Sequence, residues 1–559
     1  MKSRFFSGQK LKRPFIVAAL VIAALIPFAF TGNNNYFEIS KNLDVFATLY
    51  KEVNTYYVDD IEPAKFMRTG IDAMLESLDP YTNYISEADI EGYRFQTTGK
   101  YGGIGAIIRK SGDNMIIAEP YKGFAADKAG LIAGDILLEV EGKSTKGKSV
   151  DDISKILKGT PGTEIKILIQ HPGEKNTELK TFMREEVKVN SVPYWGMVNN
   201  NIGYIRLTQF TENCGQDVAN ALKELESKNQ LKGLVFDLRG NPGGLLNEAV
   251  NVSNIFIDKG QLVVSTKGKV KEWDKIYNSL NEAIDAKIPL VILANSGSAS
   301  ASEIVSGTIQ DYDRGVIIGQ KTYGKGLVQT TRPLTYGTQL KVTTAHYFTP
   351  SGRCIQALDY EHRNEDGSVG KIPDSLKHPF KTKAGRTVFD GGGVDPDFVL
   401  VPEKFSPIAG SLYSKNLIFD YATQYKLAHA TIPSAMEFHL TDAEYDDFVK
   451  SLNGKDYDYT TKSEEKLKDF KSAAENEEYW AALKEDYEHL QSEMKHDKEN
   501  DLVKFKDEIK GLLEEEISMR YYYQNGRIEA SLKDDPEVAK AIEVLNDTEL
   551  YTKTLQASK

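Results

Sequence analysis

The chain has 559 residues, of which 40% are apolar and 27% are charged, and its formal net charge is −12. This length allows three or four domains, and the composition supports a buried core in a soluble protein. The negative charge argues against nucleic acid as a main partner.

Residues 1–35 predict a segment that directs export. Five basic residues (Lys2, Arg4, Lys10, Lys12 and Arg13) precede the apolar run "PFIVAALVIAALIPFAF". A basic flank before a short N-terminal apolar run is typical of a signal peptide or a membrane anchor, and a buried core helix is the alternative. We expect a periplasmic protein, or one anchored in the inner membrane that faces the periplasm. Cleavage of the segment stays open.

The rest of the chain divides into four regions by its patterns. Residues 36–95 predict amphipathic helices, and residues 96–187 predict a small domain of short strands with glycine turns and two helices. Residues 188–403 alternate strands and helices, which predicts an α/β core with a helix-covered sheet. Residues 404–559 are rich in Glu, Lys, Asp and Tyr and predict a helical domain that packs on the rest, with a partner-binding coiled coil as the alternative.

The cysteines and histidines give no sign of a metal or a cofactor. The two cysteines, Cys214 and Cys354, form no disulfide framework, and we expect two separate buried residues, although pairing stays open. The eight histidines have no metal-ligand spacing. We therefore predict that the protein needs no metal and no nucleotide.

The segment "NSGSASASEIVSG", residues 295–307, contains a candidate nucleophile at the start of a helix. Ser300 would lie in the positive end of the helix field, beside unpaired N–H groups that could bind an oxyanion. The alternative is that Ser300 only caps the helix, because Ser300 and Glu303 also form a capping-box pattern.

A nucleophilic serine needs a base, and Lys325 in "GQKTYGKG" is a candidate. The segment resembles a phosphate-binding loop, but Gly326 replaces the hydroxyl residue and the following residues alternate like strands, so no helix is available for a phosphate. Lys325 could act as a base if burial lowers its pKa. The alternatives are a solvated turn lysine or a base role for His346, which no pattern supports.

The segment "VFDLRGNPGG", residues 235–244, ends a buried strand in a glycine turn. Either this is only a tight turn, or a backbone N–H of Gly243 or Gly244 is an oxyanion donor beside the Ser300 helix.

Taken in order, "DLRGNPGG", "SASASEI", "TYGKGLVQ", "YFTPSGRCIQ" and "GGGVDP" resemble the carboxy-terminal processing, or tail-specific, serine proteases over roughly residues 40–400. The resemblance implies a crotonase/ClpP-like α/β protease core with an inserted PDZ domain, N-terminal helices and a helical C-terminal extension. It also implies a serine–lysine dyad without histidine. The residues so assigned are Ser300 as nucleophile, Lys325 as base, Gln329 to orient the lysine, the backbone N–H groups of Ala301 and of Gly243 or Gly244 for the oxyanion, and Asp311 as a structural acid paired with Arg314.

Residues 96–187 resemble a PDZ domain. The loop "YGGIGA" would bind a C-terminal carboxylate, and the strand from Ala106 would pair with the peptide. The alternative is an ordinary strand turn. The peptide-binding residues implied are Gly102, Gly103, Ile104, Gly105, Ala106, Ile153 and Leu157. His171 stands where the family often has arginine, so an interdomain ion pair there would depend on pH.

The hypothesis is an exported serine endopeptidase that binds apolar C-terminal tails through its PDZ domain and cleaves through an acyl-enzyme. An adaptor protein or a second copy of the chain are the other partners considered, with the membrane if the N-terminal segment is retained. The alternative function is a non-catalytic PDZ scaffold, against which the intact trio of Ser300, Lys325 and Gln329 argues. A small-molecule serine esterase is a third reading, and the absence of a G-x-S-x-G motif counts against it.

Overall fold

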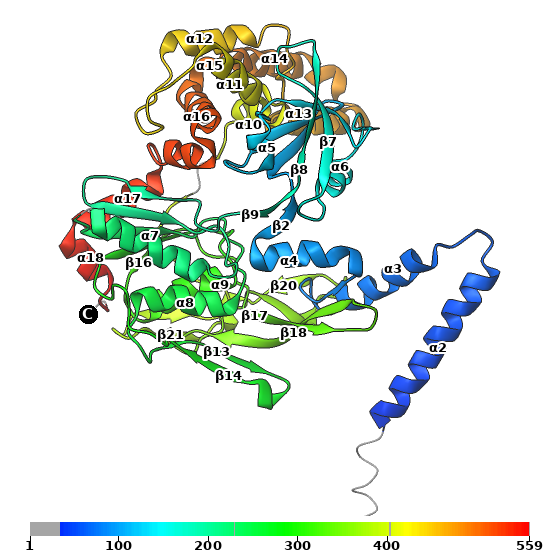
Figure 1. The fold of residues 1–559 in the computed structure, drawn as a ribbon, viewed down its shortest axis with the longest axis vertical. Helices are drawn as coiled ribbons and strands as arrows, with labels where there is room; N and C mark the ends of the chain where they lie inside the picture. Colours follow the sequence, from blue (N-terminus) through cyan, green and yellow to red (C-terminus); the bar gives the residue numbers. More distant parts are fainter. Residues whose placement is uncertain (1–33, 229, 402–403, 558–559) are drawn as a thin grey trace, which may run out of the picture. The chain divides into compact units, whose positions relative to one another are not determined.

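The computed structural model of the chain describes residues 34–228, 230–401 and 404–557, and Figure 1 labels many of its helices and strands. The predicted signal peptide or anchor falls mostly on residues 1–33, which lie outside the described residues. The chain divides into two units, residues 1–84 and 85–559, and each is described by itself. Among the helices of the described ranges, none has both the length and the apolar character that crossing a bilayer requires.

The first unit contains two amphipathic helices, as the spacing of apolar residues predicts. Pro63 stands at the first position of the second helix, where its missing N–H is tolerated. The ring of Tyr50 stacks on Phe66 with 5.7 Å between the centroids, and its hydroxyl donates to the Pro63 carbonyl at 2.8 Å. The elements here are α2 (Asn34–Tyr56) and α3 (Pro63–Glu76), with β1 (Asn83–Ile85) at the end of the unit.

The second unit begins with a short helix and the small β-rich domain. Ile165, Ile167 and Ile169 alternate along one strand and are fully buried, which gives the domain one apolar sheet face. The sheet order is β3-β4-β5-β7-β8, with β6 beside β5, while β2 pairs with β9. The elements are η1 (Glu87–Asp89), α4 (Ile90–Thr98), β2 (Lys100–Gly103), β3 (Ala106–Ser111), β4 (Asn114–Pro120), α5 (Ala125–Lys128), β5 (Ile136–Val140), β6 (Lys143–Ser144), α6 (Val150–Leu157), β7 (Glu164–Gln170), β8 (Thr177–Met183) and β9 (Glu185–Lys188).

The core is a six-stranded sheet of order β10-β11-β12-β15-β16-β23, parallel except for the β10–β11 pair. Alternate side chains face opposite sides: Phe236 packs with α7, α8 and α9, and its neighbour Val235 packs with α17. Burial on both faces explains the continuous apolar runs of these strands. The elements are β10 (Tyr194–Met197), β11 (Ile202–Arg206), α7 (Cys214–Lys228), β12 (Gly233–Asp237), α8 (Leu246–Phe256), β15 (Leu290–Ala294), α9 (Ala301–Asp311), β16 (Val316–Gly319) and β23 (Phe398–Val399).

A second sheet lies beside the core and includes the predicted hairpin after Lys325. Strands β17 and β18 form this hairpin, and its turn places Tyr336 and Gly337 at positive φ (54° and 68°). Strand β18 also pairs with β13, which pairs with β14. The elements here and in the adjoining hairpins are β13 (Leu262–Gly268), η2 (Lys271–Trp273), β14 (Lys275–Asn278), β17 (Leu327–Pro333), β18 (Gln339–Phe348), β19 (Leu358–Arg363), β20 (Val369–Lys371), η3 (Asp374–Leu376), β21 (Pro379–Lys381) and β22 (Thr387–Phe389).

The C-terminal region is helical, as predicted, but its helices contact two different places. Helices α10, α11, α12 and α16 share one apolar cluster, whereas α17 packs on the core sheet. Tyr523 interrupts α16 with non-helical φ and ψ of 59° and −155°. The helices are α10 (Pro407–Ser414), α11 (Leu417–Ala428), α12 (Asp442–Ser451), α13 (Lys462–Asn476), α14 (Trp480–Glu499), α15 (Asp501–Lys504), α16 (Lys506–Ser531), α17 (Pro536–Asn546) and α18 (Thr548–Thr554).

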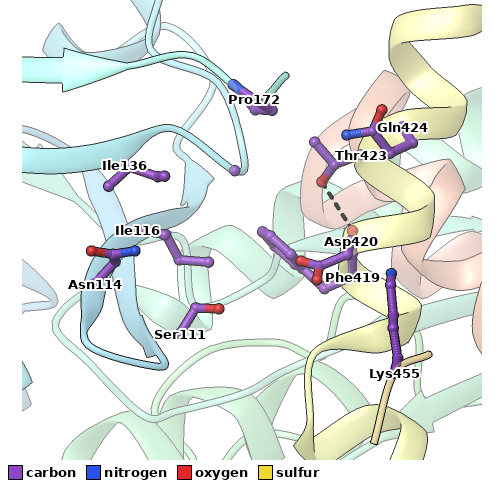
Figure 2. A pocket seen from close by; sticks show the side chains of 11 residues that line it. Ser111, Asn114, Ile116, Ile136, Pro172, Phe419, Asp420, Thr423, Gln424 and Lys455 are labelled. Atoms are coloured by element: carbon purple, nitrogen blue, oxygen red, sulfur yellow. Dashed lines mark hydrogen bonds between the residues drawn. The ribbon is translucent and has the colours of Figure 1, made fainter. Parts of the chain in front are cut away.

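Helix α17 also reaches the loop that follows β12. The Arg239 guanidinium contacts Asp237 at 2.7 Å, and it contacts the α17 carboxylates Asp535 at 2.7 Å and Glu537 at 2.6 Å. Helix α11 lies on the small β-rich domain, and a cavity of about 270 Å³ lies between them, as Figure 2 shows. The predicted α/β class with N-terminal helices and a helical C-terminal extension is therefore confirmed.

Candidate active site

A cleft of about 490 Å³ contains the predicted catalytic residues. Ser300, Lys325 and Gln329 all line it, although they come from the start of α9, the loop before β17 and β17 itself. The cleft walls are formed by α4, the loop after β12, the start of α9 and the β17–β18 hairpin. The lining residues are Tyr93, Gln96, Thr97, Gln209, Pro242, Gly243, Gly244, Leu245, Leu246, Ser300, Ala301, Ile304, Lys325, Val328, Gln329, Lys341 and Tyr347.

Ser300 precedes α9 in a backbone conformation that an ordinary capping residue does not have. Its φ of 56° and ψ of −109° lie far from the extended values of a usual N-cap. Non-glycine residues keep such conformations only where their surroundings hold them, and many such residues lie in active sites. The neighbouring hydroxyls have other partners: Ser298 donates to the Leu238 carbonyl at 2.8 Å, and Ser302 donates to the Asn241 carbonyl at 2.9 Å. Both serines are buried, whereas Ser300 lines the cleft.

A single buried carboxylate joins the nucleophile segment to the lysine loop. Glu303 accepts hydrogen bonds from the N–H of Ser300 (2.8 Å), Gly324 (2.7 Å) and Lys325 (2.9 Å), and from the Thr322 hydroxyl (2.6 Å). Burial raises the pKa of the Glu303 carboxyl, and these hydrogen bonds oppose that shift. The predicted capping-box partner therefore also holds the two candidate catalytic residues on one side of the cleft.

Gln329 lies on β17 with its side chain in the cleft. Its Nε2 donates to the Thr343 hydroxyl on β18 at 3.1 Å. This bond orients the amide and leaves Oε1 as the acceptor end of the side chain.

The two predicted glycine donors differ in their contacts. The Gly243 N–H donates to Asn241 Oδ1 at 2.9 Å, so it already has an acceptor. A Cβ on Gly243 would lie 2.9 Å from both Ala301 N and Ser300 Cβ, so only glycine allows this close approach. Within the described residues, neither the Gly244 N–H nor the Ala301 N–H has an intramolecular acceptor at hydrogen-bond distance. The geometry therefore favours Gly244 over Gly243 as the partner of Ala301.

Three protein families match the chain. Peptidase family S41 matches residues 201–362, a PDZ domain matches residues 116–171, and "Probable PDZ-protease, C-terminal helical domain" matches residues 408–545. The "Carboxy-terminal-processing protease" of Bartonella bacilliformis is 38% identical over 350 residues, which are 62% of this chain and 80% of that protein. The chain belongs to the carboxy-terminal-processing protease family.

Two further relatives fit this assignment. The "Probable CtpA-like serine protease" of Staphylococcus aureus (strain N315) is 39% identical over 318 residues, 56% of this chain and 62% of that protein. The solved structure of a photosystem II D1 C-terminal processing protease is 29% identical and covers 64% of this chain and 92% of that chain, with a TM-score of 0.35. The three family matches and the Bartonella bacilliformis relative show that the chain is a serine-type peptidase with an S41 core, a PDZ domain and a C-terminal helical domain.

The predicted pairing of Asp311 with Arg314 in this protease is wrong. Asp311 contacts Arg353 at 2.9 Å, with both side chains almost fully buried, and it accepts from the Ser351 N–H at 2.9 Å. Arg314 instead donates to three backbone carbonyls, those of Phe256, Asp285 and Ile288. Asp311 lies on the last turn of α9, so its buried pair fixes the helix that begins at Ser300.

The predicted peptide-binding residues of the PDZ domain lie in the expected elements, but the groove is packed. Gly102 and Gly103 end β2, and Ala106 begins β3, which pairs only with β4 among the described strands. Ile153 and Leu157, on α6, are 1% and 4% exposed and belong to the domain core with Ile104. In this structure they do not present a surface to a peptide side chain. The tyrosine of the loop motif, Tyr101, lies over Gly103.

His171 does not make the interdomain pair that its position suggested. Its Nδ1 lies 2.6 Å from Asp135 and its Nε2 lies 3.3 Å from Glu178, both in the PDZ domain. Cys214 and Cys354 are both free cysteines in this structure.

Several residues of the site were not predicted. Tyr347 donates from its hydroxyl to the Ser300 carbonyl at 3.2 Å, and α4 supplies a wall of the cleft. The only available signal was indirect: Tyr347 follows His346 in the "YFTPSGRCIQ" region, and α4 ends at a glycine just before the PDZ domain.

Proposed function

We propose that this protease cleaves polypeptides with Ser300 as the nucleophile and Lys325 as the general base. The observation that supports this most is that both residues line one cleft while Glu303 accepts from the N–H groups of both. Positioning of the two reacting groups removes much of the entropic barrier to their proton transfer.

The proposed reaction has two halves. The neutral Lys325 amine takes the proton of the Ser300 hydroxyl as Oγ bonds to the scissile carbonyl carbon. The resulting ammonium gives this proton to the leaving amine as the C–N bond breaks, which leaves an acyl-enzyme. Water then gives a proton to Lys325 and attacks the ester, and the proton returns to Ser300 as the acid product leaves.

Two groups of donors and acceptors support these steps. The N–H groups of Ala301 and Gly244 would bind the oxyanion of each tetrahedral intermediate. Gln329 Oε1, oriented by the bond from Nε2 to Thr343, would accept from the lysine and aim it at Ser300.

The PDZ domain would select the substrate by its C-terminal tail. Strand β3 has an edge without a partner strand in the described sheet, which is where a peptide strand adds in PDZ domains. An apolar last side chain would need the groove beside α6 to open, because Ile153 and Leu157 are buried. We infer that tail binding requires a rearrangement at β3 and α6.

The proposed location is the far side of a cell membrane. The basic flank and apolar run of residues 1–35 support export, either as a periplasmic protein or as one anchored in the inner membrane. Fractionation of cells that express the full chain tests this location.

The test of the activity uses the full chain and an unfolded protein substrate with an apolar C-terminal tail. Ser300→Ala and Lys325→Ala are each expected to lower kcat/KM by about 10³-fold or more. Ser296→Ala and Lys321→Ala are matched controls, because both residues are exposed and lie outside the cleft. Mass spectrometry of the chain during turnover should detect an added acyl mass that Ser300→Ala abolishes.

The scaffold alternative predicts a different result. The full chain would then bind the tail with no cleavage at any pH, and Ser300→Ala would change nothing. Cleavage that survives Ser300→Ala would contradict the proposed nucleophile.

A further inference from the structure

In the described part of the chain, the active-site cleft is lined by basic side chains and by no acidic ones. Among the described residues that line it, the charged side chains are two lysines, Lys325 and Lys341, and none is Asp or Glu. The whole chain has a formal net charge of −12. The proposed reaction uses Lys325 as a neutral amine, so Lys341 is the basic side chain of this lining that is left to carry a positive charge, and it has no part in the proposed proton transfers.

Lys341 lies on the same wall as Gln329. It stands on β18 opposite Thr331 of β17, and the next pair of that face is Gln329 opposite Thr343. Since paired strand residues two apart share a face, Lys341 and Gln329 face the same side of the hairpin. The hydroxyl oxygen of Thr331 lies 2.5 Å from the hydroxyl oxygen of Tyr93 on α4, so this part of the wall faces α4 across the cleft.

Among the described residues, the Lys341 amine has no carboxylate partner. In the described part of the chain, no Asp or Glu lies within ion-pair distance of it, and no hydrogen bond from it is found. The side chain is half-buried, and burial alone lowers the pKa of the amine. A partly desolvated ammonium without a partner is unfavourable, and binding a carboxylate in the cleft removes that penalty.

We propose that Lys341 is a specificity-determining residue that binds a carboxylate of the substrate chain. This inference rests on the proposed peptidase reaction in the same cleft. Thr331 follows Lys325 by six positions, which is at most about 20 Å of extended chain, so the carboxylate lies a few substrate residues away from the scissile bond. Its source is either an acidic side chain or the α-carboxylate of a short peptide.

The experiment uses unstructured peptides that share one sequence and one cleavage site. Each pair of peptides carries Glu or Gln at one position, and kcat/KM is measured with the full chain. At one position we expect the Glu peptide to be cleaved about tenfold faster than its Gln partner, the range of a hydrogen bond to a charged group. A second series with free or amidated C-termini identifies the α-carboxylate as the source.

Variants then assign the preference to Lys341. Lys341→Met keeps the length of the side chain and should reduce the ratio of kcat/KM for the Glu and Gln peptides to about 1. Lys341→Arg should retain most of the ratio. Lys275→Met is the matched control, because Lys275 is exposed on β14 of the same sheet, outside the cleft, and its loss should leave the ratio unchanged. If Lys341 had only a structural role, Lys341→Met would change kcat/KM for both peptides of a pair by the same factor. A preference that is absent in both series, or that persists in Lys341→Met, overturns the proposal.

Binding separates this proposal from the proposed function. The same pairs are measured by fluorescence anisotropy with the Ser300→Ala chain and with the Ser300→Ala/Lys341→Met chain. If the parent cleaves no peptide while the Glu preference in binding depends on Lys341, the peptidase proposal fails and the carboxylate site stands. If cleavage occurs and neither cleavage nor binding depends on the charge at position 341, the carboxylate site fails alone.

Discussion

Helix α17 and the part of α16 before Tyr523 contact different parts of the second unit: α17 mainly through apolar side chains, with the Arg239–Glu537 ion pair at its start, and α16 through charged ones. Val538, Ala541 and Val544 of α17 are buried against core strands, together with Val291 and Ile318. Before its interruption, α16 carries Glu516 and Arg520, whose buried charges lie beside the PDZ residue Arg109. The α17 contact with the core is mainly apolar, whereas the contact of the helical domain with the PDZ domain combines buried charges with apolar packing of Phe419 on Ile116 and Ala133.

The contact with the PDZ domain centres on one ring. The guanidinium carbons of Arg109 and Arg520 lie 3.6 Å and 4.2 Å from the centre of Phe419. The Tyr523 hydroxyl donates to Asp127 at 2.8 Å. Beside the ring, the cavity of Figure 2 separates α11 from the PDZ strands, and polar side chains such as Gln424 line it.

The difference between the α17–core contact and the α16–PDZ contact indicates which of the two can open. Apolar burial depends little on salt and fixes α17 on the sheet, whereas charged contacts weaken with ionic strength and tolerate water. Arg109 belongs to β3, the strand proposed to pair with the substrate tail. We therefore expect the PDZ domain to be the separable part, and its contact with α16 to respond when a tail binds at β3.

Glu516→Gln should have the largest effect. Glu516 contacts Arg520 at 2.9 Å and Arg527 at 2.8 Å, and its loss leaves buried guanidinium groups without their carboxylate. We expect the opening free energy of α16, measured by amide hydrogen exchange, to fall by about 3–5 kcal/mol. Glu493→Gln, on an exposed position of α14, is the control. An unchanged exchange rate in α16 would mean that these charges do not hold the helix.

Glu515, also on α16, predicts a stability that depends on pH. Burial raises the pKa of Glu515 to about 7, against nearby Arg527. Because the folded state retains this proton above the ordinary pKa of 4.5, Glu515 makes stability fall as pH rises from about 4.5 to 7. Glu515→Gln should exceed the parent by less than about 1 kcal/mol at pH 5 and by up to about 3 kcal/mol at pH 8, as followed by thermal melting. Equal melting temperatures at both pH values would refute the prediction.

Val544→Ala tests the apolar contact between α17 and the core sheet. Val544 is fully buried, and loss of its two methyl groups should lower the stability of the α17–sheet contact by about 2 kcal/mol. Amide exchange in α17 and β12 measures this loss, with the exposed Glu543→Ala as control. The loss of stability should be the same at 0.05 M and 1 M NaCl. A strong salt dependence would contradict the expected difference between the apolar contact of α17 and the charged contact of α16.

Tyr523→Phe should have the smallest effect. It removes the hydrogen bond to Asp127 and should weaken the PDZ contact by about 1 kcal/mol, seen as faster exchange in α5. This effect should shrink at 1 M NaCl, where the Debye length is about 3 Å. Tyr522→Phe is the matched control, because the Tyr522 hydroxyl donates to carbonyls of the helical domain. If both variants increased amide exchange in α5 equally, the Tyr523–Asp127 hydrogen bond would not be what stabilises the PDZ contact.

Local patterns predicted much of the fold, and the family resemblance assigned Ser300, Lys325 and Gln329, which all line one cleft. The apolar runs of β12, β15 and β16 follow from burial on both faces of a parallel sheet. The partners that join distant segments could not be read in this way. Asp311 pairs with Arg353 rather than with the nearby Arg314 because the buried pair forms across the fold.

Two further features needed the tertiary structure. Glu303 reads as a capping residue, and its bonds to the Lys325 loop exist only because β16 returns that loop to α9. The apolar stripe of α17 predicts a helix with one buried face but does not say that the face covers the core sheet. A stripe is equally compatible with packing inside the helical domain.

The return of α17 to the core has a consequence for the order of synthesis. Arg239 after β12 and Glu537 in α17 are in contact although they are 298 residues apart. One face of the core sheet therefore stays uncovered until the ribosome has made the PDZ-contacting helices and then α17. Contacts of such long range form late. A nascent or partly translocated chain would thus lack a finished protease core, so the proposed activity would begin only when synthesis is almost over.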